Sequence, residues 1–296
     1  MTILNQIVQG VLLGGYYALL ACGLSFMFGV MRVINLAHGS LAVAGAYGVY
    51  WLADRQGIHP FVGLLMCVPV MGAIGWILYR LVLARSMRSG ELVPILATFG
   101  LAVVFDNMLF SAFGADTRSL APFLNDLAYD GFDFAGLSVG MLPLITLVIG
   151  IALLGGLHLM LTHSALGRRI RAVADDPATA QLVGVNSAAV NAAAAAIAMM
   201  SVGIAGTFLA MRATVDPYAG APQLIFAFEA VMIGGTGSLW GTLFGGIALG
   251  VAQSLGAGIH SQGFLIAGHV LFLAVLLFRL VLAGRPVMHL FVRNSK

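Results

Sequence analysis

The chain has very little charge: only 8% of its 296 residues are Asp, Glu, Lys or Arg, whereas 60% are hydrophobic. A soluble domain of this length would need far more charge on its surface. Its apolar stretches are about 20 residues long, which is the length of a membrane-crossing helix. They also exclude a transmembrane β-barrel, whose strands are short and alternate in hydropathy. The composition therefore predicts an all-α polytopic membrane bundle, with residues 1–296 forming a single transmembrane domain.

Residues that carry chemistry are also scarce. Lysine occurs once, at position 296, and no G-x-x-x-x-G-K-[ST] phosphate loop is present. No Ser/His/Asp, Cys/His or HExxH arrangement indicates catalysis, and His158 and His163 share a helix face too poorly to form a metal site. Cys22 and Cys67 lie inside apolar stretches, so a disulfide framework is not expected. We therefore expect no enzyme active site, no metal and no cofactor bound by this chain.

The basic residues are distributed among a few loops, which predicts orientation. Most of the 14 lie near three segments and the C-terminus: Arg32, Arg80, Arg85, Arg88, Arg168, Arg169, Arg171, Arg279, Arg285, Arg293 and Lys296. Positive loops stay in the cytoplasm. The pattern therefore predicts a cytoplasmic location for 81–91, 163–187 and the C-terminal tail, and a periplasmic N-terminus. This spread over membrane loops argues against a nucleic-acid partner, and membrane lipids are the expected surroundings.

The number of spans depends on one long apolar block. Apolar stretches cover 5–28, 33–53, 61–80, 92–113, 140–162, 188–210, 221–258 and 263–282. The block 221–258 is too long for one helix and short for two, yet it must cross twice if the C-terminus is cytoplasmic. We expect a short helix that ends near Ile233, a turn at "GGTGS" and a fuller helix from about 241. The prediction is eight full spans plus one short or broken segment.

The loop "THSALGRRIRAVADDPATAQLVGVN" (162–186) contains the signals of a short helix. Asp176 is a good N-cap and Pro177 suits the first helical position. Gly184 can adopt the left-handed conformation that ends a helix. A two-turn helix is unstable alone in water, so neighbouring helices or a docking partner must hold it. The alternative is an ordinary loop with one incidental helical turn.

The segment "MRVINLAHGS" (31–40) is unusually polar for its apolar surroundings. Arg32, Asn35 and His38 are three residues apart, so on a helix they would form one polar stripe. Near a cytoplasmic helix end the arginine can reach water. The stripe either forms a polar hairpin with interhelical hydrogen bonds or borders a translocation path.

Two acids lie in apolar context, Asp106 in "LAVVFDNMLF" and Glu229 in "IFAFEAVMIGG". Acids inside spans face a bundle interior or an aqueous cavity. They are therefore candidates for the translocation path. Structural pairing, for instance with Arg32 or Arg212, is an equally good explanation.

Glycines are concentrated in "GGTGSLWGTLFGG" (234–246). Gly237, Gly241 and Gly245 form overlapping G-x-x-x-G units, which are typical of close helix packing. Gly234, Gly235 and Gly237 could also break a helix near the membrane midplane and expose backbone groups to substrate. Both functions are compatible.

Three segments carry a family resemblance. The stretch 167–186 resembles the cytoplasmic loop of permeases in branched-chain amino acid ABC importers, at Gly167, Arg168, Arg171, Ala172, Asp175, Asp176, Ala180, Gly184 and Asn186. The stretches 29–47 and 234–246 resemble the family's N-terminal signature and its glycine-rich segment. The resemblance covers nearly the whole chain and favours the LivH-type subunit. It departs from the family at Ser40, where an acid usually follows His-Gly.

The resemblance implies a fold like that of type II ABC importer permeases, in the bacterial inner membrane. The loop 163–187 would be the coupling loop, and its short helix at about 177–183 would sit in a groove of an ABC ATPase subunit that uses ATP. A sister permease and a periplasmic substrate-binding protein would complete the importer. Its substrate would be a branched-chain or related amino acid, and amides, urea or small carboxylates are the alternative substrates. The alternative is an ion-coupled secondary transporter or channel for a small polar solute.

Overall fold

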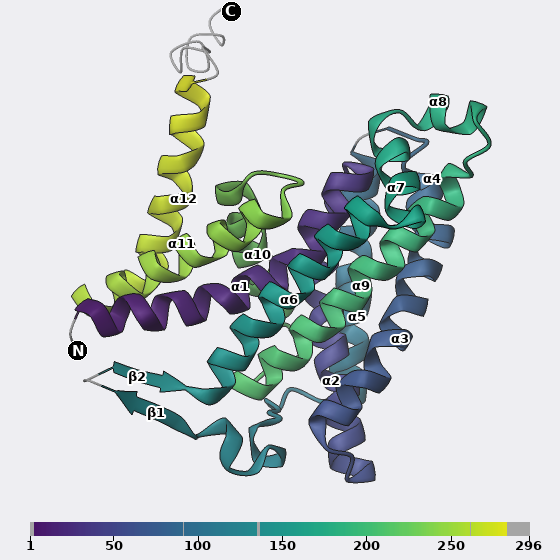
Figure 1. The fold of residues 1–296 in the computed structure, drawn as a ribbon. Helices are drawn as coiled ribbons and strands as arrows, with labels where there is room; N and C mark the ends of the chain where they lie inside the picture. Colours follow the sequence, from purple (N-terminus) through teal and green to yellow (C-terminus); the bar gives the residue numbers. More distant parts are fainter. Residues whose placement is uncertain (1–2, 91, 135–136, 261, 283–296) are drawn as a thin grey trace, which may run out of the picture.

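The computed structural model describes residues 3–90, 92–134, 137–260 and 262–282, which form a bundle of long helices (Figure 1). The long helices are α1 (Ile3–Met31), α2 (His38–Gln56), α3 (Pro60–Leu78), α5 (Val93–Phe113), α6 (Met141–His163), α9 (Ser187–Arg212), α11 (Leu239–Ile259) and α12 (Gly263–Leu282). The shorter ones are α4 (Ala84–Ser86), α7 (Ala165–Asp175), α8 (Pro177–Leu182) and α10 (Gly220–Gly234), and a π-helical turn, Tyr79–Leu83, joins α3 to α4.

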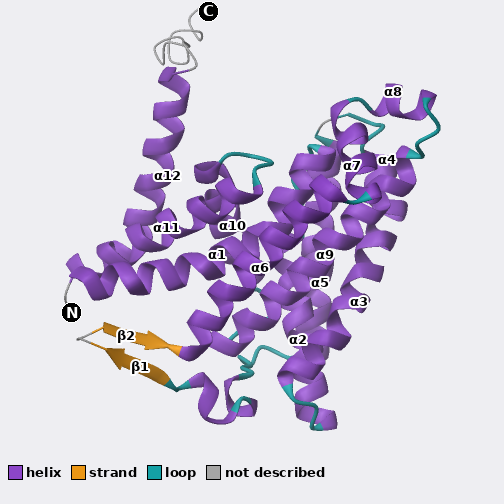
Figure 2. Cartoon of the chain, in the orientation of Figure 1, coloured by secondary structure: helices purple, strands orange, loops and turns teal. Residues whose placement is uncertain are grey.

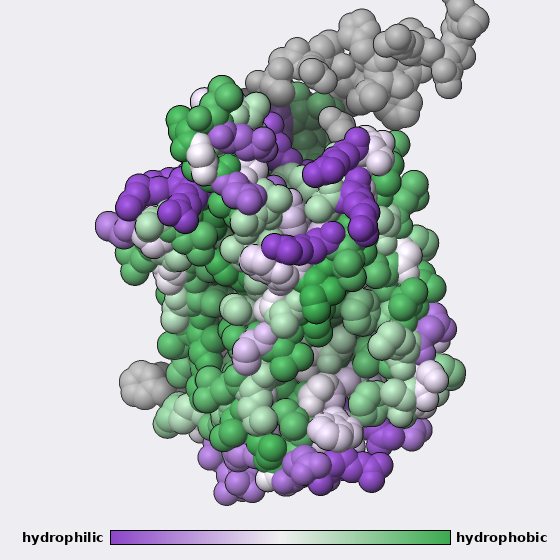
Figure 3. All heavy atoms as spheres, turned by 90° about the vertical axis from the view of Figure 1, so that its right-hand side faces the viewer, coloured by the Kyte–Doolittle hydropathy of each residue, from purple (hydrophilic) through white to green (hydrophobic). Residues whose placement is uncertain are grey.

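On the face shown in Figure 3, an apolar band lies between two hydrophilic ends. Among the described residues, seven helices are long and apolar enough to cross a membrane: 3–31, 60–86, 93–113, 141–163, 187–212, 239–259 and 263–281. The helix α10 is apolar but shorter. These features make the chain a multi-pass membrane protein.

The predicted count of eight full spans is one too high by this criterion. The difference is α2, whose predicted stretch 33–53 begins as a helix only at His38. It contains three glycines and ends on the polar sequence "ADRQ" (53–56), so it lacks a sustained apolar length. It is nevertheless part of the bundle, where it packs against α9, α3 and α10.

The predicted division of the block 221–258 is confirmed. The helix α10 ends at Gly234, and α11 begins at Leu239 after a tight turn. Gly235 and Gly237 have φ angles of 102° and 79° in this turn, a conformation that residues with a Cβ rarely adopt. The glycine-rich segment is therefore a helix break followed by a new helix.

One feature had no counterpart in the all-α prediction, the hairpin of β1 (Gly131–Phe134) and β2 (Leu137–Gly140) (Figure 2). Its strands are antiparallel, and Phe132 pairs with Val139. The hairpin is tied to the start of α1, because the Ser138 amide donates to Asn5 Oδ1 at 3.2 Å. Strands of four residues give too short a hydropathy pattern to be recognised between helices.

Helix α1 lies at the centre of the bundle and packs most extensively against α11, with α6, α9 and α10 around it. A Cβ added at Gly14 would overlap backbone atoms of Gly246 and Ile247, and one added at Gly10 would meet Val251. The two helices therefore touch backbone to backbone, as small residues permit in lipid. The predicted close packing of Gly245 is also confirmed, since its added Cβ would overlap the Ala230 carbonyl oxygen.

We expect Gly14→Ala to destabilise the protein by about 1–3 kcal/mol, because the new methyl group meets backbone rather than a movable side chain. The thermal unfolding midpoint of the purified protein in detergent measures this loss. Gly156→Ala in α6 is the matched control, since nothing lies within 4 Å of a Cβ added there. An equal shift in both variants would contradict the importance of the α1–α11 contact.

Candidate functional site

The helices α7 and α8 project from one end of the bundle (Figure 1). The hydroxyl oxygen of Ser164 accepts a hydrogen bond from the Gly167 amide at 2.8 Å and caps α7. A Cβ added at Gly167 would overlap carbonyl oxygens of Met160 and Leu161. The glycine therefore allows the sharp corner between α6 and α7.

The predicted short helix is confirmed as α8, with the predicted caps. Asp176 Oδ1 accepts from the amides of Ala178 and Thr179 at 2.9 and 3.1 Å. The Thr179 hydroxyl donates to Oδ2 at 2.5 Å, and this bond, followed by the amide bonds, lowers the pKa of Asp176. Because folding lowers this pKa, the cap stabilises α8 above the unfolded value of about 3.9 and is lost as the pH falls through the folded pKa. Gly184 has φ of 85°, as the left-handed C-terminal position requires.

The same loop is fastened to α9. Asn186 caps α9 by accepting from the Ala189 amide at 3.0 Å, and the Ser187 hydroxyl donates to the Pro177 carbonyl at 3.2 Å. Ala180 is buried, 4% exposed, and its carbonyl accepts from the Val185 amide at 3.0 Å. Six of the nine predicted coupling residues thus shape the loop: Gly167, Asp176, Pro177, Ala180, Gly184 and Asn186.

The remaining three, Arg168, Arg171 and Asp175, are exposed on α7. Two apolar side chains that sequence reasoning did not single out are even more prominent: Leu182 is 87% exposed and Val183 74%. Such exposed apolar groups on a polar loop are typical of a surface that meets a partner. A search for apolar residues at the end of the predicted helix could have found them.

Arg32, Asn35 and His38 do not form a helical stripe, and the alternative of a polar hairpin with an interhelical hydrogen bond is confirmed for His38. The helix α1 ends at Met31, Arg32 has φ of 53°, and α2 begins at His38. Asn35 and His38 are fully buried and hold this break: Asn35 Oδ1 accepts from the Ala37 amide at 3.0 Å. His38 Nε2 is hydrogen-bonded to the Leu20 carbonyl oxygen at 2.8 Å.

Arg32 is exposed and borders a cavity of about 500 Å³ between the end of α1 and the start of α5. This cavity also contacts Met87 and Pro94. The three polar residues therefore share one broken segment but differ in role. That Arg32 borders the translocation path stays a prediction.

Both acids have partners other than the suggested arginines, although only Glu229 is buried and Asp106 is half-buried. Glu229, only 3% exposed, has Oε1 at 2.5 Å from His269 Nδ1 of α12. Asp106 interacts with the Ser40 hydroxyl of α2. The ion pairs found among the described residues join neither acid to Arg32 or Arg212.

The predicted glycine turn is closely packed. A Cβ added at Gly234 would overlap the Gly241 carbonyl oxygen. The Ile233 carbonyl, freed by the end of α10, accepts from Arg279 Nη2 at 3.0 Å. At least this backbone group is therefore occupied by a side chain, and exposure of the Gly235–Gly237 backbone to substrate stays a prediction.

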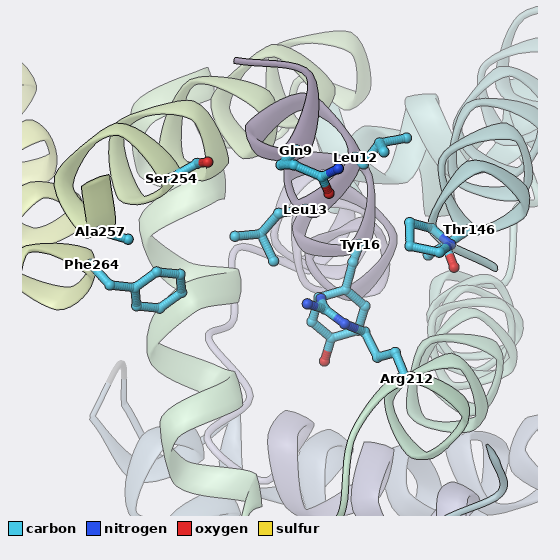
Figure 4. A pocket seen from close by; sticks show the side chains of 10 residues that line it. Gln9, Leu12, Leu13, Tyr16, Thr146, Arg212, Ser254, Ala257 and Phe264 are labelled. Carbon is cyan, nitrogen blue, oxygen red and sulfur yellow. The ribbon is translucent and has the colours of Figure 1, made fainter. Parts of the chain in front are cut away.

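A cavity that the sequence did not predict lies between α1, α6, α9, α11 and α12, in the half of the bundle that carries the hairpin (Figures 1 and 4). Its volume is about 260 Å³. Ten residues line it: Gln9, Leu12, Leu13, Tyr16, Pro143, Thr146, Arg212, Ser254, Ala257 and Phe264.

Paired tyrosines of α1 support this cavity. The Tyr16 hydroxyl donates to Gln223 Oε1 at 2.7 Å, and the Tyr17 hydroxyl donates to Gln253 Oε1 at 2.5 Å. Arg212 Cζ lies 4.7 Å from the Tyr16 ring centre. Single polar side chains within apolar stretches were the signal in the sequence that could have predicted this cavity.

Comparison with known proteins identifies the family. The protein-family model for the permease component of the branched-chain amino acid transport system matches residues 6–281. The chain belongs to this permease family. It is 28% identical to the high-affinity branched-chain amino acid transport system permease protein BraD of Pseudomonas aeruginosa and 27% identical to LivH of Escherichia coli, over 96% of each chain. No solved structure matches it significantly.

More distant permeases also match. The probable branched-chain amino acid permease LivH of Methanocaldococcus jannaschii is 28% identical over 94% of this chain and 90% of its own length. The fructose import permease FrcC of Rhizobium meliloti is 29% identical over 74% of this chain and 61% of its own length. The predicted resemblance is therefore confirmed. The names of the relatives describe components of transport systems.

For the α8 cap we expect Asp176→Ala to loosen the first turn of α8, because the amides of Ala178 and Thr179 lose their acceptor. The amides of 178–180 should then exchange with deuterium roughly 2- to 30-fold faster, measured by hydrogen exchange and mass spectrometry. Asp175→Ala is the matched control, since the neighbouring carboxylate is exposed and does not cap α8. Unchanged exchange in Asp176→Ala would contradict the cap.

For the buried acid we expect His269→Ala to lower stability by about 1–3 kcal/mol, because the Glu229 carboxylate then lacks its described partner. Thermal unfolding in detergent measures the change. Adding Glu229→Gln to His269→Ala should recover part of the loss, since a neutral amide is cheaper to bury. If the double variant is no more stable than His269→Ala, the loss of the Glu229–His269 pair does not explain the destabilisation.

Proposed function

We propose that this permease is the transmembrane subunit of an ATP-driven importer for branched-chain or related amino acids. The observation that carries this proposal is the α7–α8 unit, a capped helix that presents Leu182 and Val183 to solvent. Two turns of helix held outside the bundle, with apolar side chains facing outward, suit a groove on a soluble partner. The partner of that chemistry is an ABC ATPase subunit.

The names of the relatives support the substrate class. BraD and LivH are named as branched-chain amino acid permeases, whereas FrcC is named as a fructose import permease. A sister permease and a periplasmic substrate-binding protein complete the proposed importer, in which ATP is used by the ATPase subunits. The permease itself contributes the single membrane domain and no cofactor.

The charge distribution supports an orientation in the bacterial inner membrane. The loop arginines of 80–88 and 168–171 belong to the end of the bundle that carries α8, which we assign to the cytoplasm. The hairpin end, with the start of α1, is then periplasmic. Arg285, Arg293 and Lys296, which also entered the prediction of a cytoplasmic C-terminus, lie outside the described residues.

The loop geometry indicates how movement of an ATPase would reach the membrane. The Ser187–Pro177 bond and the Asn186 cap join α8 to the start of α9. Helix α9 packs against α1, α2 and α3 and ends at Arg212, beside the cavity. A push on α8 is therefore transmitted along α9 to the opposite end of the bundle, switching access to the pathway between the two sides.

The test is affinity purification of the tagged permease in mild detergent from its own host. We expect an ABC ATPase to accompany the wild type and to be reduced about tenfold or more in Leu182→Asp/Val183→Asp, because charge in an apolar contact costs over 1.4 kcal/mol. Tyr129→Asp is the matched control, 79% exposed on the hairpin side.

Equal ATPase recovery from all three forms would contradict docking through α8. The rival function is an ion-coupled secondary transporter that uses Asp106 and Glu229. A permease that purifies alone and transports in liposomes with only an ion gradient would favour that rival.

A further inference from the structure

We propose that the cavity between α1, α6, α9, α11 and α12 binds a small solute with a carboxylate and an apolar side chain, and that Arg212 binds the carboxylate. This inference rests on the proposed import function and names the residue that recognises the substrate inside the permease. It also gives a role to Arg212, which belongs neither to the coupling loop nor to the glycine turn.

Arg212 has the chemistry and the position for this task. It is the last residue of α9, and its side chain reaches back over the Tyr16 ring into the cavity (Figure 4). Arg212 is exposed, so its guanidinium lies at the open edge of the cavity, where a solute from water would meet it. Stacking on an aromatic face leaves the guanidinium N–H groups available in the plane, where they fit a carboxylate in a bidentate manner.

Within the part of the chain that the structure describes, no Asp or Glu forms an ion pair with the Arg212 guanidinium. The ion pairs found among the described residues join Arg55 to Asp54, Arg118 to Asp116 and His269 to Glu229. The ten residues that line the cavity include no Asp or Glu. A positive charge at the edge of an apolar cavity, without a fixed counter-ion, favours an anionic group on whatever enters.

The surface beneath Arg212 is fixed in advance. The Tyr16 hydroxyl is held by Gln223 of α10, and the adjacent Tyr17 hydroxyl is held by Gln253 of α11. The ring on which the guanidinium rests therefore cannot turn freely. Preorganisation of this kind lowers the entropic cost of binding a small ligand.

The rest of the lining fits an amino acid. Gln9 uses its Nε2 to bond the Ser138 carbonyl, so its amide oxygen is left as an acceptor for an ammonium group. The Thr146 and Ser254 hydroxyls donate to the Leu142 and Gln6 carbonyls and keep lone pairs for the same purpose.

Apolar contact comes from Leu12, Leu13 and Phe264. A volume of about 260 Å³ lies just below the roughly 300–1,000 Å³ of pockets for drug-sized ligands. The cavity therefore suits a solute of a few heavy atoms with one apolar branch, such as an aliphatic amino acid.

The experiment uses the purified full-length permease, with L-leucine and L-leucinamide as probes. Ligand binding raises the thermal unfolding midpoint, so titration of each probe gives an apparent affinity. We expect leucine to bind the wild type at least about tenfold better than leucinamide, since a hydrogen-bonded charge pair is worth roughly 1.5–3 kcal/mol. Arg212→Gln should remove that preference, and Arg212→Lys should retain part of it.

Arg118→Gln is the matched control. Arg118 also stacks on a tyrosine, with its Cζ 5.7 Å from the Tyr50 ring centre, but it does not line the cavity. The Arg118→Gln variant should therefore bind leucine with the same affinity as the wild type. Equal leucine affinity in Arg212→Gln and wild type, or no stabilisation of the wild type by leucine, would overturn the proposal.

Co-purification of the ATPase with each variant separates this inference from the proposed function. An ATPase that accompanies Arg212→Gln as it does the wild type, together with a lost leucine preference, supports both. A retained ATPase with unchanged leucine binding overturns the carboxylate site alone. Loss of the ATPase from the wild type itself overturns the import function, whatever the cavity binds.

Discussion

The close crossing of α1 and α11 is the contact on which the rest of the structure depends. In a lipid environment no hydrophobic force drives helices together, so backbone-to-backbone contact through glycines must supply the attraction. Gly10 and Gly14 of α1 meet Val251 and Ile247 of α11. The other helices then pack around α1, which sets the positions of both the cavity and the broken segment after Met31.

The same crossing explains why the polar groups lie where they do. It places Tyr17 against Gln253 beside the cavity, and Tyr16 of α1, Arg212 of α9 and Ser254 of α11 all line the cavity itself. At the other end, the break after α1 leaves backbone groups that buried Asn35 and Thr98 satisfy, the latter by accepting from the Leu36 amide at 3.0 Å. Irregular backbone inside a membrane protein persists only where such partners exist.

Local signals predicted the coupling loop well. Asp176, Pro177 and Gly184 specify where α8 begins and ends through interactions within a few residues, and neighbouring chain context does not change them. The same holds for the turn after Gly234, since residues with a Cβ rarely adopt the backbone angles of Gly235 and Gly237. The stripe of Arg32, Asn35 and His38 failed for the opposite reason: helical spacing assumes an unbroken helix, and hydrogen bonds from distant residues stabilise a break.

The sequence by itself determined the membrane-spanning character and the helical class through its composition, and the short helix outside the bundle through local capping. The permease family followed from the three motifs that resemble it. Only the tertiary structure decided which helices meet. It paired Glu229 with His269 instead of an arginine, exposed Leu182 and Val183, and brought Arg212 over Tyr16 across nearly 200 residues of chain. The physical reason is that packing between spans depends on the shapes of opposed helix faces, and one span's sequence does not name its partner.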